Sequence, residues 1–459
     1  MSETYDNFIK VSEQKAFDKR HRQTINFNIG QYDKAVIKGK QQYQNIDLAR
    51  KRAAHIKHKV LHNLDIYLSD FEANFVNNGG QVIYAEDKEE AVSEILKILK
   101  KHDARHVVKS KSMTTEELEL NHHLEKNKIE SLETDLGEYI VQIAGEKPYH
   151  IVTPAMHKSK EDIAELFNKK FDLPAESTPQ EITAYVRKKL REKFIHADVG
   201  ITGANFLISD IGGIAVSENE SNALLSMSFP KVHIAIAGIE KLIPSIKDLQ
   251  TFWPLLSTFG TGQNVTVYNS IITGPRKEGE TDGPMDMYVV IIDNGRTRLL
   301  ARSQQRRALS CIRCGACLNG CPIYKNIGGH TYATTYSGPI GSVITPFLCG
   351  IEEYKHLSYA SSLCGKCSEV CPVYIPLHKL LLYNRRDFVR EKKVTPMERL
   401  IMTGFKLFLL KRKRMDFFNS TLKNYGIQMF FKSPWGQRRD LPVFQKKSFN
   451  KIMRERMIK

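Results

Sequence analysis

Short hydrophobic runs alternate with amphipathic segments between residues 76 and 300. Runs such as RHVVKSK and MYVVIIDNG are rich in β-branched residues, which predicts strands. In segments such as DKEEAVSEILKILKKH, hydrophobic residues recur every three or four positions, which predicts amphipathic helices. Apolar strands that alternate with such helices predict a parallel, doubly wound α/β domain.

The same patterns assign the individual elements of this domain. We expect strands at residues 79–86, 105–111, 129–135, 138–145 and 149–155, and in the apolar regions 197–218, 231–243 and 287–295. We expect helices at residues 87–102, 114–127, 159–171 and 178–194. Thr114 and Glu117 have the spacing of a capping box, which predicts that the second helix begins at Thr114.

The remainder of the chain divides into three further regions. Residues 1–75 predict a basic, helical N-terminal region. Residues 301–385 contain every cysteine together with short Gly-Pro turns, and residues 386–459 predict a basic, helical tail. We therefore expect four regions, with the α/β domain at residues 76–300.

Positive charge is concentrated near the C-terminal end. The net charge is +17, of which residues 381–459 contribute +15 through 21 Lys and Arg against 6 Asp and Glu. The preceding residues are nearly neutral, so we do not expect a nucleic-acid-binding protein. No segment approaches the roughly 18 consecutive apolar residues of a membrane span, and the polar start MSETYDNFIKVSEQKAFDKR does not resemble a secretory signal. We expect a cytoplasmic protein.

The basic tail also carries hydrophobic residues next to its cations. These are Ile401, Phe405, Phe408 and Leu409, which precede four consecutive cations, and later Phe430, Phe431 and Trp435. Such a segment can pack on the protein's own body, bind an acidic partner protein or contact an anionic membrane surface.

All eight cysteines lie between Cys311 and Cys371. The sequence Cys311-x2-Cys314-x2-Cys317-x3-Cys321-Pro is the bacterial ferredoxin run, whose fourth cysteine ligates the neighbouring cluster. Three thiolates at this spacing can surround one iron–sulfur cube, and the proline directs the chain toward a second cube. The motif predicts iron–sulfur clusters, most simply two [4Fe–4S] clusters.

The second motif, Cys364-x2-Cys367-x3-Cys371-Pro, lacks the first cysteine, and Ser361 stands at that position. In two-cluster ferredoxins the last cysteine of each motif ligates the cluster of the other motif. The same arrangement here assigns cluster 1 to Cys311, Cys314, Cys317 and Cys371. It assigns cluster 2 to Cys321, Cys364 and Cys367, which leaves one ligand missing. Cys349 is the one remaining thiol and a candidate for the fourth ligand, although a lone cysteine in TPFLCG can also be a small core residue.

Zinc and disulfides are the alternatives for these cysteines. Zinc sites prefer two CxxC pairs separated by a finger-like loop, and disulfide scaffolds distribute cysteines through small secreted domains. The two Cys-Pro endings favour clusters over both. Tyr324, Ile327, Tyr374 and Ile375 follow these endings and are expected to form an apolar shell around the sulfurs.

The α/β region carries small and polar residues where strands are expected to end. These are TGANF at residues 202–206, DIGG at 210–213 and SENESN at 217–222, which suit a ligand crevice. Glu218 could act as a base there, or be a solvated loop carboxylate. Lys109, Lys111 and Ser112 could hold an anion, whereas His122, His123 and His330 have no metal-ligand spacing. The dinucleotide and P-loop fingerprints are absent.

These motifs together resemble the lactate utilization protein B family. The resemblance rests on KSKSMTTEELELNHHLE, ADVGITGANFLISDIGGIAV, ITGPRKEGETDGP, CIRCGACLNGCPIYKNIGGHTY and LCGKCSEVCPVYIPLHKLL, and it covers about residues 40–385. It implies a LUD domain similar to the NagB/RpiA/CoA-transferase-like fold, followed by a ferredoxin-like two-cluster domain. It also implies that the cluster ligands are Cys311, Cys314, Cys317, Cys321, Cys364, Cys367 and Cys371.

The resemblance implies an electron carrier that acts with partner subunits in the oxidation of L-lactate to pyruvate. One alternative is an oxidoreductase subunit with its own substrate site in the α/β domain. Another is a non-catalytic redox sensor. Missing cofactor fingerprints argue against the first alternative, and two clusters favour a relay over a sensor.

Overall fold

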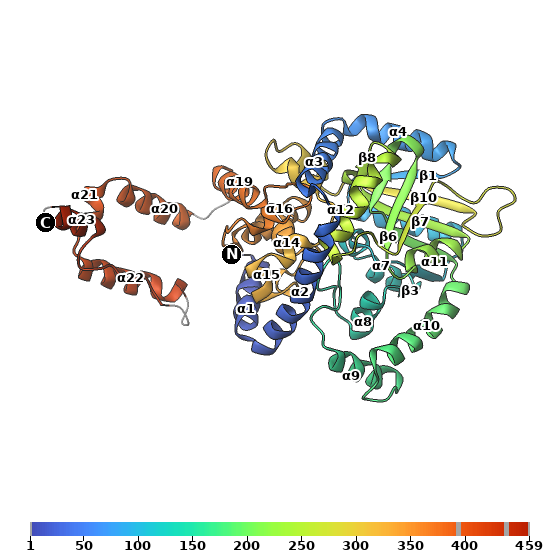
Figure 1. The fold of residues 1–459 in the computed structure, drawn as a ribbon, viewed down its shortest axis with the longest axis horizontal. Helices are drawn as coiled ribbons and strands as arrows, with labels where there is room; N and C mark the ends of the chain where they lie inside the picture. Colours follow the sequence, from blue (N-terminus) through green and yellow to red (C-terminus); the bar gives the residue numbers. More distant parts are fainter. Residues whose placement is uncertain (1, 392–395, 436–439, 458–459) are drawn as a thin grey trace. The chain divides into compact units, whose positions relative to one another are not determined.

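A six-stranded, fully parallel sheet forms the centre of the α/β domain in the computed structural model, which describes residues 2–391, 396–435 and 440–457 (Figure 1). Its strands, in spatial order, are β1 (Gln81–Ala85), β10 (Asp286–Ile292), β7 (Val232–Gly238), β4 (Val199–Gly203), β2 (His106–Lys109) and β3 (Glu130–Glu133). All seven residues of β7 are buried, because the central strands are covered on both faces. This architecture confirms the predicted α/β class.

A second, four-stranded sheet was not predicted. Its order is β8 (Leu242–Ile243), β5 (Phe206–Ile208), β6 (Gly213–Glu218) and β9 (Tyr268–Ile272). The β5–β6 and β6–β9 pairs are antiparallel, whereas β5 and β8 pair in parallel. Gly212, in a left-handed conformation with φ 57°, allows the tight connection between β5 and β6. The single apolar region 197–218 therefore supplies strands to both sheets.

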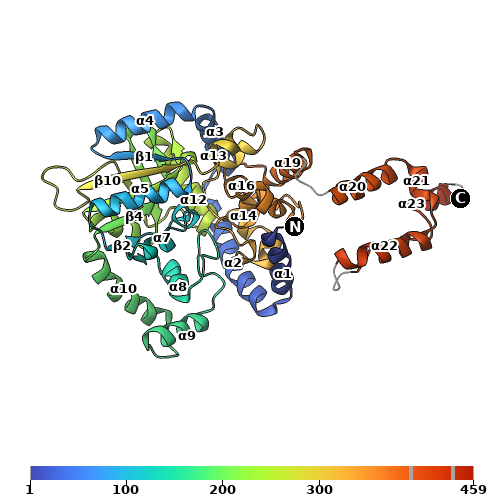
Figure 2. The ribbon, with the colours of Figure 1, turned by 180° about the vertical axis from the view of Figure 1, so that it is seen from behind.

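Helices cover the sheets and build most of the rest of the chain (Figures 1 and 2). Around the sheets lie α5 (Lys88–Lys101), α6 (Met113–Glu117), α7 (Leu120–Lys126), α8 (Leu136–Ala144), α9 (Lys160–Phe171), α10 (Pro179–Ile195), α11 (Asn222–Ser228) and α12 (Leu249–Thr261). The cysteine region contains α13 (Arg296–Leu300), η5 (Gln305–Ser310), α14 (Ala316–Asn319), α15 (Pro322–Ile327), α16 (Gly338–Leu348), α17 (Ile351–Tyr354), α18 (Lys366–Glu369) and α19 (Leu377–Arg390).

Three of the predicted elements are wrong. EYIVQIAG belongs to helix α8, which begins at the Asp135 cap and ends at Gly145, because its apolar residues pack on the α9 and α10 side. Residues 149–155 form turns without a strand. The predicted helix at 114–127 is two helices, since Glu119 adopts φ 49°, and its cap is Ser112, whose Oγ accepts from Thr115 N.

Three of the four N-terminal helices pack against the cysteine region. The four are α1 (Glu3–Phe17), α2 (Lys19–Gly39), α3 (Ile46–His62) and α4 (Leu64–Asn77), of which α4 packs instead on β1 and β8 of the α/β domain. Helix α1 contacts α15 and α17, and the hydroxyl of Thr4 donates to Glu353 O at 2.8 Å. Lys325 of α15 pairs with Asp33 of α2 at 3.0 Å. The first and last parts of this unit are therefore joined directly (Figure 2).

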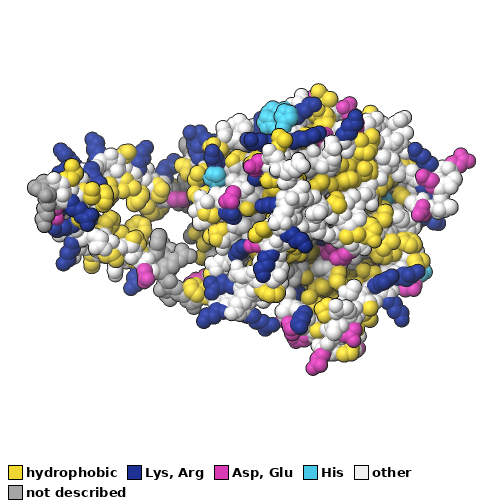
Figure 3. Space-filling model, viewed as in Figure 1, with side chains coloured by type: hydrophobic (Ala, Val, Ile, Leu, Met, Phe, Trp, Pro, Cys, Tyr) yellow, Lys and Arg dark blue, Asp and Glu magenta, His cyan; other side chains and the backbone are white. Residues whose placement is uncertain are grey.

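The chain forms two compact units, residues 1–387 and 388–459. The second unit contains α20 (Pro396–Leu409), α21 (Arg412–Phe417), α22 (Ser420–Trp435) and α23 (Phe449–Met457). Hydrophobic side chains lie beside Lys and Arg on its surface (Figure 3), with Ile401, Phe405 and Leu409 exposed. The side chain of Trp435 lies outside the described residues. No helix in the described parts of the chain is long and apolar enough to cross a membrane. The cytoplasmic location stays a prediction.

Candidate iron–sulfur site

The first cysteine motif forms a tight loop followed by one helical turn. Arg313 and Gly315 adopt left-handed conformations with φ 62° and 79°, which reverse the chain between cysteines. The backbone N–H of Arg313 donates to Cys311 Sγ at 3.4 Å. Helix α14 carries Cys317, and Cys321 precedes α15, whose first residue is a proline. The loop therefore presents its first three thiols to one space.

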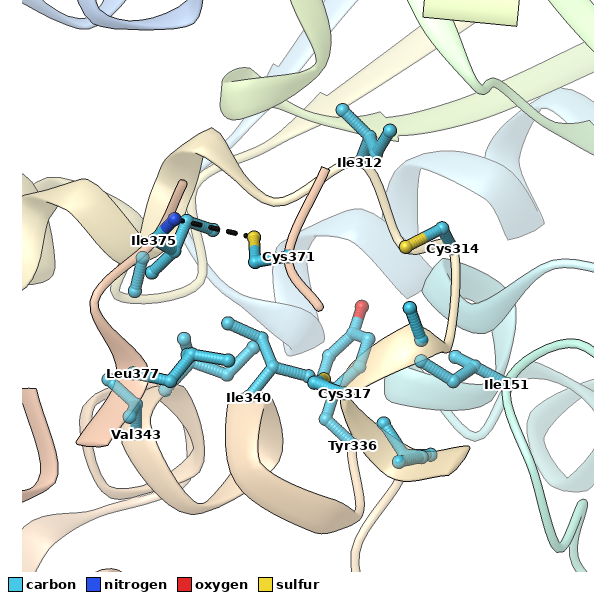
Figure 4. Close-up of a cluster of buried hydrophobic side chains, with 14 of the residues drawn as sticks. Ile151, Ile312, Cys314, Cys317, Tyr336, Ile340, Val343, Cys371, Ile375 and Leu377 are labelled. Carbon is cyan, nitrogen blue, oxygen red and sulfur yellow. Dashed lines mark hydrogen bonds between the residues drawn. The ribbon is translucent and has the colours of Figure 1, made fainter. Parts of the chain in front are cut away.

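The second motif has the same construction. Leu363 and Gly365 adopt φ 56° and 83°, and α18 carries Cys367. After Cys371 the chain turns back, and Ile375 N donates to Cys371 Sγ at 3.3 Å (Figure 4). Backbone donors to sulfur stabilise thiolates, as cluster ligands require.

The structure brings Cys311, Cys314, Cys317 and Cys371 around one small cavity, which we call the thiol cavity. Its remaining lining is apolar, with Ile340, Ile375 and Leu377 among the side chains drawn in Figure 4. Burial, and then the other three thiols, raise the pKa of Cys317 far above its usual value. Four soft donors in an apolar enclosure are the ligand set that an iron–sulfur cluster uses.

Cys321, Cys364 and Cys367 form a second thiol group. Burial, followed by Cys321 and Cys364, raises the pKa of Cys367 to about 11. Cys364 is exposed, and the N–H of Lys366 lowers its pKa. The charge of Cys367 also raises the pKa of Cys317, so the two thiol groups are neighbours. Buried neutral thiols must lose protons to bind iron, so cluster insertion releases protons here.

Cys349 lies in a different environment. It follows α16. The loss of contact with water, and then the negative charge of Glu117, raise the pKa of its thiol to about 11. The next strongest influences on it are Lys88, Glu119 and Arg296. Cys349 is also not among the strongest influences on Cys321, Cys364 or Cys367, so its electrostatic environment differs from that of the second thiol group.

The predicted apolar shell is buried at three of its four positions. Tyr324, Ile327 and Ile375 are at most 7% exposed, and Ile375 lines the thiol cavity. Tyr374 is half-buried, and its hydroxyl donates to Asp47 at 2.6 Å. Arg50 of α3 stacks on the Tyr374 ring at 4.0 Å and donates to Cys371 O at 2.8 Å. Helix α3 therefore fixes the second motif, and this contact was not predicted because Arg50 and Cys371 are distant in the chain.

A buried charge network connects the sheet to the first motif. Arg296 forms a bidentate pair with Glu117 at 2.8 Å and a bond to Glu240 at 2.6 Å. Arg313 bonds to Glu240 at 3.1 Å, and Lys57 donates to Glu240 O. Burial favours the neutral form of Glu240, but Arg296, Arg313 and Lys241 outweigh it and hold its pKa at about 2. These residues were not predicted, because their partners are distant in sequence.

A larger cavity of about 350 Å³ lies at the edge of the sheet, next to the thiol cavity. We call it the sheet-edge cavity, and its charged lining residues are Lys111, Asp135, Glu218, Glu220, Lys241 and Arg313. Cys314 lines both cavities. The predicted polar segments 202–206 and 217–222 contribute to this lining, whereas Asp210 of the third segment bonds to Ile246 N elsewhere.

The predicted polar candidates have structural partners. Both carboxylate oxygens of Glu218 accept backbone N–H groups at the start of α11, from Ala223 at 2.7 Å and Leu224 at 2.9 Å. Lys109 is fully buried between Glu133 and Glu116, and Lys111 donates to Ile151 O. Ser112 caps α6. Glu218 and Lys111 nevertheless line the sheet-edge cavity.

The sequence around His330 showed no metal-ligand spacing. In the structure, His330 nevertheless lies near two other side chains of kinds that can bind a metal. The ligand atoms of Glu146, His157 and His330 all lie within 4.8 Å of one another. Lys158 pairs with Glu146 at 2.7 Å and already supplies positive charge there. The rings of His122 and His123 meet edge to face, with centroids 5.9 Å apart.

Comparison with known proteins defines the class of this protein. The LUD domain family model matches residues 68–292, and the 4Fe-4S dicluster domain model matches residues 307–375. The chain is thus a LUD-domain protein with a dicluster iron–sulfur domain, and its cysteine arrangement is that of two [4Fe–4S] clusters.

The relatives narrow this class. Lactate utilization protein B of Bacillus velezensis is 46% identical over 360 residues, which are 78% of this chain and 75% of that protein. Lactate utilization protein B of Bacillus thuringiensis is 45% identical over 372 residues, which are 81% of this chain and 78% of that protein. Among solved structures, a DUF162 family protein from Deinococcus radiodurans aligns over 50% of this chain and 98% of its own, at 13% identity and a TM-score of 0.26. The chain belongs to the lactate utilization protein B family, which confirms the resemblance.

Proposed function

We propose that this chain is an electron carrier in the oxidation of L-lactate to pyruvate, acting with partner subunits of the same system. The observation that carries the proposal is the pair of adjacent thiol groups, one buried and one reaching the surface at Cys364. Two clusters in line give electrons a route from the interior to a docked partner. The proposed ligands are Cys311, Cys314, Cys317 and Cys371 for cluster 1, and Cys321, Cys364 and Cys367 for cluster 2.

The test is anaerobic co-purification of the chain with its partners, followed by iron and sulfide analysis. We expect about eight irons and eight sulfides per chain, and L-lactate should reduce the clusters only when the partners are present. Zinc without acid-labile sulfide would contradict the proposal.

The sheet-edge cavity favours a second candidate function, a substrate site within this chain. Lys241 and Arg313 line the cavity beside Cys314, so a bound organic acid would lie next to cluster 1. This candidate predicts that the purified chain alone reduces a dye with L-lactate, whereas the electron-carrier proposal predicts no such reduction.

Glu218 separates the two candidates more sharply. If it only caps α11, Glu218→Gln should leave electron transfer by the assembled complex within a few-fold of normal. If Glu218 is instead a general base, the same substitution should lower the rate roughly 10²-fold or more. Glu192→Gln, on the exposed surface of α10, is a matched control.

The second unit is proposed to dock the partner subunits. Its exposed hydrophobic side chains beside cations suit an acidic protein surface, and an anionic membrane surface is the alternative. Binding of the purified chain to anionic vesicles in the absence of partners would favour the membrane.

A further inference from the structure

The two cysteine motifs repeat one backbone design. Cys314, Cys317 and Cys321 correspond to Cys364, Cys367 and Cys371, each 50 positions later. Helices α14 and α18 begin and end at corresponding residues, Ala316–Asn319 and Lys366–Glu369. The two helices also contact each other. Residues at corresponding positions therefore face their own clusters in the same way.

The loops before these helices agree in conformation as well. Arg313 and its counterpart Leu363 both adopt left-handed conformations, with φ 62° and 56°. Gly315 and Gly365 do the same, with φ 79° and 83°. A left-handed conformation is unusual for arginine and leucine, so its occurrence at both positions shows that the loop shape is shared in detail.

Ser361 occupies the position that Cys311 has in the first loop. Arg313 N donates to Cys311 Sγ at 3.4 Å, and Leu363 N donates to Ser361 Oγ at 3.1 Å. The serine oxygen is thus turned toward its loop by the same backbone donor as the cysteine sulfur. Cys311 lines the thiol cavity and belongs to the first thiol group.

The competing thiol is placed elsewhere. The charges that act most strongly on Cys349 are those of Glu117, Lys88, Glu119 and Arg296, whereas those that act most strongly on Cys367 include Cys321 and Cys364. The second thiol group then offers three sulfurs for a cluster that takes four ligands. The repeat places one further side chain, that of Ser361, at the position of the missing ligand, and its donor atom is an oxygen.

We propose that Ser361 Oγ is the fourth protein ligand of the second cluster, an inference that rests on the proposed presence of two clusters. The iron–oxygen bond forms as the hydroxyl gives its proton to solvent, and no electron is transferred in this step. Serine oxygen is a harder donor than thiolate sulfur, so the iron at this corner is held less firmly than the other three. Cys364, on the same cluster, is exposed, which gives solvent access to this side.

The test compares Ser361→Ala and Ser361→Cys with the natural chain, each purified anaerobically and then exposed briefly to a mild oxidant. The natural chain should begin with about eight irons and lose iron slowly. Ser361→Ala should fall to about seven irons and show the electron paramagnetic resonance signal of an oxidised three-iron cluster. Ser361→Cys should keep all its iron and show an altered signal for the second cluster alone.

Cys311→Ser is the matched control, because it gives the first loop the ligand that the second loop has. The first cluster should then acquire the oxidant sensitivity of the second. Cys349→Ser should behave like the natural chain.

The possible failures are distinct. A natural chain without iron and sulfide would overturn the proposed function itself. A natural chain with eight irons whose Ser361→Ala variant has the same spectrum and the same iron loss would overturn the serine ligand. Iron loss in Cys349→Ser equal to that in Cys364→Ser would assign the position to Cys349.

Discussion

Single side chains decide how the cysteine region is attached to the α/β domain. Glu240 follows β7 and accepts from Arg296 and Arg313, which come from two separate segments near the first motif. Its carboxylate is fully buried, so removing either cation would leave the buried network with less compensation for its negative charge. Such losses commonly cost about 3–5 kcal/mol. The position of the first thiol group is therefore coupled to the edge of the sheet.

The cysteines can be distinguished by substitution. Cys314→Ser should make cluster 1 lose iron more readily on exposure to oxidant, because a hydroxyl is a weaker ligand for iron than the buried thiolate it replaces. Cys349→Ser should retain both clusters, because the charges that act most strongly on its thiol are Glu117 and Lys88 rather than the other cysteines. Iron analysis of both variants provides the measurement. Loss of four irons from Cys349→Ser would contradict this prediction.

Acid sensitivity is expected at His233 in β7. Its Nε2 bonds to Thr202 Oγ1 at 2.8 Å, and burial lowers its pKa to about 3. Below about pH 6.5 the unfolded imidazole binds a proton that the folded one does not, so stability falls as pH falls toward 3. The difference reaches about 2 kcal/mol at pH 5.

His233→Gln should therefore lose less unfolding free energy between pH 7 and pH 5 than the natural chain loses. Denaturant unfolding at both pH values provides the measurement. The exposed His62→Gln variant should retain the natural pH dependence. Equal losses in the natural chain and in His233→Gln would mean that His233 does not set this slope.

At the scale of elements, hydrophobic pattern predicted the strands of the central sheet well and the surrounding segments less well. β7 and β10 are covered on both faces, so their continuous apolar runs are unambiguous. EYIVQIAG has a similar composition but forms α8, because Asp135 caps its first turn and Gly145 ends it. A short apolar run fits either element, and tertiary packing decides between them.

In the candidate site, too, some features follow from local sequence patterns and others depend on tertiary packing. Cysteine spacing predicted the seven thiols of the two groups, since each motif holds its cysteines within one short segment. The second sheet, Lys241 and Arg313 depend on contacts between distant segments. Arg313 stands inside the first motif, and its left-handed conformation is a feature that sequence does not display.

Two glycines that look alike in sequence should respond oppositely to alanine. Gly200 of β4 lies so close to α11 that a Cβ there would meet Ser226 O at 1.7 Å. Gly200→Ala should destabilise the chain by about 1–3 kcal/mol or more, because strand and helix must separate. A Cβ at Gly30 in α2 would meet nothing within 4 Å. Gly30→Ala should be stabilising by about 0.5–1 kcal/mol, since alanine favours helix. Thermal unfolding of the two variants compares them directly.

At the scale of the whole molecule, the proposed cluster ligands and the charged surface belong to different units. All seven proposed cysteine ligands precede residue 388, whereas residues 388–459 carry +14 of the net charge of +17. The first unit thus holds the proposed electron route, and the second unit carries hydrophobic side chains beside cations.

Truncation after Asp387 should leave both clusters in place and weaken association with partner subunits. Iron content and co-purification measure the two effects separately. Association of the full chain should also weaken with salt, because the screening length falls from about 10 Å at 0.1 M to 3 Å at 1 M. A truncated chain that still co-purifies fully at low salt would contradict the docking role.

The joining of the first helices to the last cysteine motif also orders events during synthesis. Arg50 binds the carbonyl of Cys371, and Thr4 binds that of Glu353, so these helices find their partners only after more than 300 residues have followed. At about 5–20 residues per second, the ribosome needs on the order of tens of seconds for that length. Helices α1 to α3 are therefore made long before their partners and complete their packing only after the cysteine motifs have been made. Under the proposed function, iron and sulfide are delivered after both motifs have left the ribosome, when the enclosure around the thiols is about to close.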